Sequence, residues 1–242
     1  MTWVLRTCFS AWAFAALALP DAPITVRGSI ELVASRDPMV RKHKDYSGVV
    51  VWLEPLGRLV APAIPSRPAL MVQKNKMFSP HVLAIPVSGS VAFPNLDPIF
   101  HNAFSNFNGQ IFDVGLYKPG SSRTVVFNRA GIVRVFCNIH PQMSAVIAVL
   151  DTPYFAVSGK SGDFEILNVP PGDYQFHVFH ERAAPETLDV LTRKITVEAA
   201  RLDLPPLTIS ESGYLPAPHH NKYGKDYPPV IEVQPAYPGG NK

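Results

Sequence analysis

Several features are missing from this chain of 242 residues, and each absence narrows its class. Beyond the N-terminus, no apolar run is long enough to cross a hydrocarbon core about 30 Å thick, so the mature chain should have no membrane span. The formal net charge is only +3, and the longest basic cluster is Arg41-Lys42-His43-Lys44. That charge pattern gives no case for nucleic-acid binding, and we expect the cluster in a solvated loop.

The chain also lacks the motifs of common enzyme classes and the pattern of a long helix. It has no glycine-rich phosphate loop, no serine nucleophile elbow and no His-Glu-x-x-His sequence, so we do not expect an enzyme. No stretch carries a sustained apolar period of about 3.6 residues. An all-β protein is therefore expected.

Residues 1–20 are expected to be a secretory signal peptide. Arg6 precedes the apolar run 11–19, which at about 1.5 Å per residue is too short to span a bilayer. In an alternative, an uncleaved N-terminal anchor, Trp3-Val4-Leu5 would extend the apolar segment past Arg6. The first interpretation predicts a soluble protein that is periplasmic or secreted.

Cysteine is scarce, and its scarcity becomes informative after export. Removal of the leader takes away Cys8 and leaves Cys137 unpaired in a compartment where thiols tend to be oxidised. Two explanations remain: Cys137 is a buried small hydrophobe, or a metal holds its thiolate.

The first part of the mature chain, residues 21–68, predicts a β segment of uncertain ownership. Residues 24–32 partly alternate apolar and polar side chains, and residues 49–53 are apolar and mostly β-branched. The proline-rich segment 55–68 ends regular structure, so we place a boundary near Arg67.

Residues 69–151 predict a β-sandwich domain. Short apolar runs follow one another there, separated by turn residues such as Pro94-Asn95 and Pro119-Gly120. The runs are residues 70–72, 81–85, 90–93, 124–127, 132–136 and 145–150.

Residues 152–209 predict a small second β module, followed by an extended, proline-rich tail at 210–242. The run 174–180 alternates, which places Tyr174, Phe176, Val178 and His180 on one face of a strand. The tail is rich in proline, tyrosine and histidine and has no apolar period.

One short loop between two predicted strands carries three metal-competent side chains. In Cys137-Asn138-Ile139-His140-Pro141-Gln142-Met143, a thiolate, an imidazole and a thioether lie close together along the chain. A cysteine and two histidines with a weak axial methionine form the ligand set of blue-copper sites. The loop therefore predicts a copper site that requires one more histidine.

His101 is the best candidate for the second histidine. It follows the predicted strand 90–93 and its turn, and so lies at a strand end that can neighbour the Cys137 strand. His81 is the rival, but it begins the strand-like run 81–85, where a histidine is usually satisfied or exposed. His177 and His180 fall on opposite faces of a strand, and His219 and His220 lie in the tail, where solvated side chains are expected.

Two stretches of the chain resemble the cupredoxins. The spacing Cys137-x-x-His140-x-x-Met143, with Pro141 after the histidine, is similar to the short ligand loop of amicyanin-type proteins. Residues 91–95 followed by His101-Asn102 resemble the strand and first ligand histidine of the plastocyanin group. The whole arrangement resembles exported "methylamine utilisation" cupredoxins with a carboxypeptidase-regulatory-like or transthyretin-like β module.

The resemblance implies a cupredoxin Greek-key β-sandwich with one type 1 copper per chain, held by His101, Cys137, His140 and Met143. The Asn102 side chain would support the site by tying the two ligand loops together. The implied function is transfer of single electrons between redox proteins of cytochrome or dehydrogenase type. The segment 106–117 is more elaborate than a minimal cupredoxin needs.

Two other functions stay open at this point. A copper carrier or storage protein would have the ion as its cargo, although such proteins usually use methionine-rich sites and only five methionines occur here. An interaction protein would use its β modules and hold a structural metal. The sequence leaves the oligomeric state, the partners and the role of the second module open.

Overall fold

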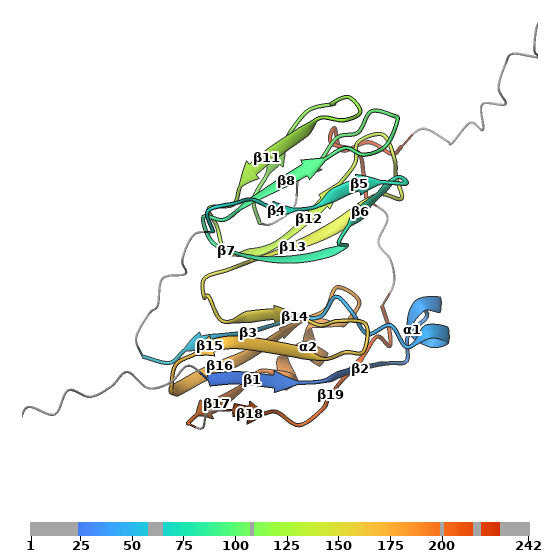
Figure 1. Cartoon of the computed structure of the whole chain (residues 1–242). Helices are drawn as coiled ribbons and strands as arrows, with labels where there is room; N and C mark the ends of the chain where they lie inside the picture. Colours follow the sequence, from blue (N-terminus) through green and yellow to red (C-terminus); the bar gives the residue numbers. More distant parts are fainter. Residues whose placement is uncertain (1–23, 58–64, 107–108, 199–200, 215–218, 228–242) are drawn as a thin grey trace, which may run out of the picture.

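The computed structural model describes residues 24–57, 65–106, 109–198, 201–214 and 219–227 (Figure 1). Strands dominate these residues, and the expected all-β class is confirmed. Figure 1 shows two bodies of layered strands, one formed by residues 69–150 and the other by strands from both ends of the chain. The expected leader lies outside the described residues, so its two interpretations stay predictions.

The first body is built from residues 69–150. Its strands are β4 (Ala69–Leu70), β5 (Val72–Lys74), β6 (Met77–Ser79), β7 (Val82–Pro86), β8 (Ser90–Pro94), β9 (Phe104–Ser105), β10 (Phe112–Asp113), β11 (Ser122–Val126), β12 (Gly131–Phe136) and β13 (Ser144–Leu150). They form a five-stranded sheet in the order β10-β9-β12-β13-β7, a three-stranded sheet β11-β8-β4 and the hairpin β5-β6. β12 and β13 are antiparallel, whereas β7 runs parallel to β13.

The second body joins the N-terminal segment to strands that follow residue 150. Its strands are β1 (Ile24–Gly28), β2 (Ile30–Val33), β3 (Val50–Pro55), β14 (Phe155–Val157), β15 (Phe164–Val169), β16 (Gly172–Phe179), β17 (Arg193–Val197), β18 (Arg201–Asp203) and β19 (Leu207–Ser210). β1 lies between β15 and β18, β3 lies between β14 and β16, and β2 pairs with β19. The first body is thus inserted, in sequence, between two parts of the second.

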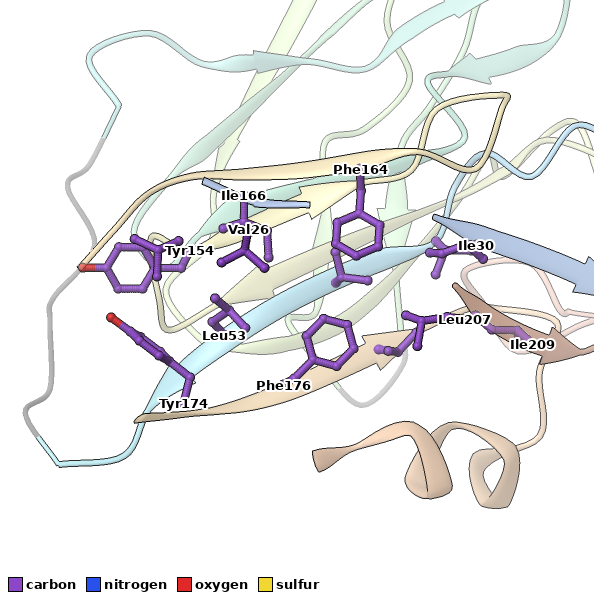
Figure 2. Packing of buried hydrophobic residues seen from close by; sticks show 14 of the residues in the cluster. Val26, Ile30, Leu53, Tyr154, Phe164, Ile166, Tyr174, Phe176, Leu207 and Ile209 are labelled. Atoms are coloured by element: carbon purple, nitrogen blue, oxygen red, sulfur yellow. The ribbon is translucent and has the colours of Figure 1, made fainter. Parts of the chain in front are cut away.

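The core of the second body draws on both parts of the chain, as Figure 2 shows. Val26 and Leu53 from the N-terminal strands pack with Ile166 and Phe176 from the later strands, and all four are buried. Burial of large apolar side chains contributes about 1.5–3 kcal/mol each. The N-terminal strands are therefore part of this core and do not form a separate element.

An apolar layer lies between the two bodies. It contains Val82 of β7, Val146 and Leu150 of β13, and Val50 of β3, all of them buried. β13 accordingly has consecutive buried residues, because one face packs in its own sandwich and the other meets the second body.

Two short helices interrupt the β structure. α1 (Pro38–His43) begins at Asp37, whose side chain accepts a hydrogen bond from the Met39 N–H at 2.8 Å, and it has a proline at its start. α2 (Pro185–Leu191) follows β16. We expected the basic cluster 41–44 to lie in a loop. This prediction is wrong, because three residues of the cluster form the last turn of α1. Among the described residues, no helix is long and apolar enough to cross a membrane.

Candidate metal centre

The alternation of β12 carries Cys137 into the interior of the first body. Val133 and Val135 face the core of that body, and Cys137, two positions further, continues the inward series with no exposed surface. Phe136 pairs with Ser144, so the loop 137–143 closes the end of the β12–β13 hairpin.

Backbone hydrogen bonds hold this loop in a compact shape. The Cys137 N–H donates to the Met143 carbonyl at 3.1 Å, and the Met143 N–H donates to the His140 carbonyl at 3.0 Å. Met143 is fully buried and belongs to the same apolar cluster as Cys137. The loop therefore brings a thiol, an imidazole and a buried thioether to one end of the sandwich.

His101 reaches the same end of the sandwich from a different loop. Its N–H donates to the Tyr117 carbonyl at 3.2 Å, and the Tyr117 N–H donates back to the His101 carbonyl at 2.9 Å. His101 has no exposed surface. A histidine buried in this way requires partners for both ring nitrogens or a ligand for one of them.

The three side chains His101, Cys137 and His140 converge on one point. Cys137 Sγ lies 3.8 Å from His101 Nδ1 and 3.5 Å from His140 Nδ1. One ligand atom from each residue lies within 4.8 Å of the others. A trigonal ion with sulfur and nitrogen bonds of about 2.3 and 2.0 Å would separate sulfur from nitrogen by about 3.7 Å. The donor set and its spacing therefore fit a metal ion of this kind.

The far nitrogen of His101 is bonded to Asp97, which sequence reasoning missed. His101 Nε2 lies 2.7 Å from Asp97 Oδ2, and the Asn75 and Lys76 N–H groups also donate to this carboxylate. Burial raises the pKa of Asp97, but these hydrogen bonds outweigh it and hold the pKa below its ordinary value. The ionised carboxylate keeps the proton on Nε2 and leaves the Nδ1 lone pair facing Cys137. The only sequence signal was an aspartate four residues before the histidine.

Asn102 connects the two loops through its backbone, whereas its side chain bonds elsewhere. The Asn102 side-chain Nδ2 donates to Asp113 Oδ1 at 2.7 Å. Its backbone N–H, with those of Ile139 and His140, donates to the Cys137 sulfur. Burial raises the pKa of the Cys137 thiol, and these N–H groups oppose the rise.

His140 lies nearer the surface than His101. It is half-buried, and its neighbour Ile139 is exposed. Burial lowers the pKa of His140, and the positive charge of Lys76 lowers it further. The neutral imidazole, which is the form that binds metals, is therefore favoured.

His81 and His177 have hydrogen-bond partners outside this cluster. His81 bonds to Glu181 and to the Ser144 carbonyl, and His177 bonds to Glu54 and stacks on Trp52. Within the described part of the chain, His101, Cys137 and His140 form the one group of at least three histidine, cysteine, aspartate or glutamate residues that is placed to hold a metal.

No family model and no curated protein matches the chain. Among solved structures, it is similar to a copper-containing nitrite reductase from Thermus scotoductus SA-01, with 26% identity, a TM-score of 0.35, and coverage of 41% of this chain and 26% of that one. A purple cupredoxin from Nitrosopumilus maritimus shares 26% identity over 34% of this chain and 96% of that one, with a TM-score of 0.30. A reduced Cu(I) form of an amicyanin mutant shares 16% identity over 41% of this chain and 98% of that one, with a TM-score of 0.33.

Proposed function

We propose that this chain is an exported type 1 copper protein that carries single electrons between redox partners. The observation that carries the proposal is the convergence of Cys137 Sγ with the Nδ1 atoms of His101 and His140 at 3.8 and 3.5 Å. Met143, fully buried in the same cluster, is the proposed axial ligand, which makes one copper per chain.

The chemistry of the donors favours copper over a hard cation. A buried thiolate, two neutral imidazoles and a thioether are soft or borderline ligands, and no carboxylate belongs to the converging group. Bound copper would supply a Cu(II)/Cu(I) couple. A set of four protein donors leaves no open position for a substrate, so we propose an electron carrier and not an enzyme.

The protein's own residues hold the ligands in place before any metal binds. Asp97 orients His101, three backbone N–H groups orient the Cys137 sulfur, and the β12–β13 hairpin fixes the loop. Burial of Cys137, His101 and Met143 excludes water from the site. Ligands held by the framework move little when charge changes, which favours fast electron transfer.

The half-buried His140 and the exposed Ile139 are the proposed contact with partners. Ile139 is 44% exposed beside the outermost ligand. Weak redox encounters use small interfaces, and an apolar edge beside a ligand histidine would serve one. We propose redox proteins of cytochrome or dehydrogenase type as partners, in the periplasm or outside the cell.

The test is a titration of the mature, metal-free protein with Cu(II), followed by visible and electron paramagnetic resonance spectroscopy. We expect intense colour and narrow hyperfine splitting that saturate at one copper per chain. Cys137→Ser should abolish the colour while the far-ultraviolet circular dichroism stays unchanged, because Cys137 supplies the thiolate and the strands do not depend on it. A wild-type protein without the signal, or a serine variant that keeps it, would overturn the proposal.

Reversible redox cycling without loss of metal distinguishes an electron carrier from a copper-delivery protein. The electron carrier should complete repeated oxidation and reduction with its copper retained in the presence of a chelator. Release of copper on reduction would instead favour delivery.

A further inference from the structure

We propose that residues 219–227, here called the C-terminal strap, position both copper-ligand loops and so control how firmly the copper is held. The inference rests on the copper function proposed above. The proposed ligands lie in the sandwich of the first body, and the strap lies outside that sandwich. The sequence predicted only an extended tail at the strap. Figure 1 shows this segment beyond β19 beside the far end of the first body.

The strap bonds directly to the loop that carries Cys137. Tyr227 Oη donates to the Cys137 carbonyl at 2.9 Å, and the Lys222 N–H donates to Asn138 Oδ1 at 3.0 Å. Tyr227 is half-buried, and burial raises its pKa to about 12, so it stays protonated as a donor. The first two residues of the ligand loop are therefore both held by the strap.

The strap also reaches the loop that carries His101. Lys222 Nζ lies 2.7 Å from Asp113 Oδ2, and the other oxygen of Asp113 accepts the Asn102 side chain at 2.7 Å. Asn102 follows His101 in the chain, and its N–H bonds to the Cys137 sulfur. Lys222 thus ties the two ligand loops through one carboxylate.

An aromatic stack adds area to these polar contacts. The His219 ring stacks on Phe136 with centroids 4.0 Å apart and meets the Tyr227 ring edge-on at 5.3 Å. Phe136 is the last residue of β12 and precedes Cys137. Aromatic pairs of this kind stabilise a contact beyond what the area they bury contributes.

The strap has a defined shape of its own. The Gly224 N–H donates to the Asn221 carbonyl at 2.9 Å, and the Asn221 N–H donates to the Lys225 carbonyl at 2.8 Å. Gly224 has φ +72°, which a glycine adopts without strain. A turn closed in this way presents Lys222 and Tyr227 together, so the contacts act as a unit.

The strap follows β19 in the chain, so a segment that is covalently continuous with the second body braces the proposed metal site of the first. A brace that limits movement of the Cys137 and His101 loops should slow copper release and preserve ligand geometry on reduction. This gives the second body a role in the copper site although it supplies no ligand.

Tyr227→Phe in the full mature chain tests the brace, and Tyr214→Phe is the matched control because Tyr214 lies outside the strap, between it and β19. In the metal-free protein, we expect hydrogen exchange of the Cys137 and Met143 amides to become roughly 2- to 10-fold faster in the first variant only, the range for loss of one hydrogen bond. In the copper-loaded protein, release to a chelator should quicken by a similar factor, and the hyperfine splitting should change.

Lys222→Met is the second variant, since it removes the link to Asp113 and keeps the backbone bond to Asn138. We expect it to shift the copper signal and to speed release. The brace is overturned if Tyr227→Phe matches Tyr214→Phe in amide exchange and in copper release. Failure of the wild-type protein to form a type 1 site would overturn the copper function instead, and the metal-free exchange data keep the two failures distinct.

Discussion

His101 Nε2 lies 2.7 Å from Asp97 Oδ2, and the histidine side chain has no exposed surface while the aspartate side chain has 7%. Both side chains of this pair are therefore shielded from water. The carboxylate also accepts two backbone N–H groups, from Asn75 and Lys76, so it is held from three directions. His101 therefore has one available orientation, with Nδ1 toward Cys137.

Asp97→Asn should weaken copper binding by roughly 10- to 100-fold, the usual effect of removing a partner of a ligating histidine. In the wild type, both carboxylate oxygens accept hydrogen bonds from N–H groups. The amide of the variant would place its NH₂ group against one of these donors, so the free energy of unfolding should fall by about 1–3 kcal/mol. Competition with a chelator measures the affinity, and urea unfolding of the metal-free protein measures the stability. Asp203→Asn, on the exposed strand β18, should change neither quantity, and equal affinities for the two variants would contradict the assigned role.

Met143→Leu should raise the reduction potential, because removal of a thioether donor destabilises Cu(II) more than Cu(I). Leucine has nearly the same volume as methionine, so the stability cost should stay below about 1.5 kcal/mol. Met71→Leu is the matched control, since Met71 is also fully buried in the same apolar cluster. Voltammetry measures the reduction potential of both variants. Equal potentials would contradict the assignment of Met143 as a ligand.

Local spacing made the ligand loop predictable from sequence. Cys137, His140 and Met143 lie on one short loop between two apolar runs, and those runs became β12 and β13. The alternation of residues 174–180 also predicted that Tyr174, Phe176, Val178 and His180 share one face of a strand, and all four are buried. In both cases the signal is carried by residues close together in the chain.

Long-range contacts gave no such signal. Pairing of β1 with β15 joins residues far apart in sequence, and no feature of the strand itself names its partner. The bond from Tyr227 to the Cys137 carbonyl joins residues 90 positions apart. The bond from His101 to Asp97 is local, but it is a single contact without a periodic pattern. α1 and α2 are too short for an apolar period to emerge.

Glu211 should make the protein less stable in acid. Burial raises its pKa, but hydrogen bonds from His180, Arg182 and Ser35 outweigh this and lower the pKa to about 2 from its ordinary 4.5. A carboxyl with a depressed pKa stabilises the folded state at pH values above its unfolded pKa, and this contribution disappears as the pH falls through its folded pKa. We therefore expect a loss of roughly 3 kcal/mol between about pH 4.5 and pH 2.

Glu211→Gln tests this dependence. At neutral pH the variant should be about 3 kcal/mol less stable, because Arg182 and His180 lose their buried charge partner, and the gap to wild type should close toward pH 2. Urea unfolding at a series of pH values measures both. Glu165→Gln is the control, since the Glu165 side chain is 51% exposed in its pair with Arg27. A gap that is independent of pH would contradict the assignment.

Phe176→Ala should lower the stability of both bodies together. Phe176 is fully buried in the core of the second body, and its truncation should cost about 3–5 kcal/mol. The apolar layer around Val50 and Val146 joins that body to the one that carries the proposed copper site. Loss of the blue colour on heating should therefore shift to lower temperature along with the loss of circular dichroism.

The control for this coupling is Leu167→Ala, because Leu167 lies in the second body but its side chain is 56% exposed. Substitution of an exposed residue usually changes stability by less than about 0.5 kcal/mol, so both midpoints should stay in place. If Phe176→Ala lowers the midpoint measured by circular dichroism but leaves the midpoint for loss of colour unchanged, the two bodies unfold independently. In that case the apolar layer and the strap would join two stable units without coupling their unfolding, and the role of the second body in the copper site would be limited to the strap's local bonds.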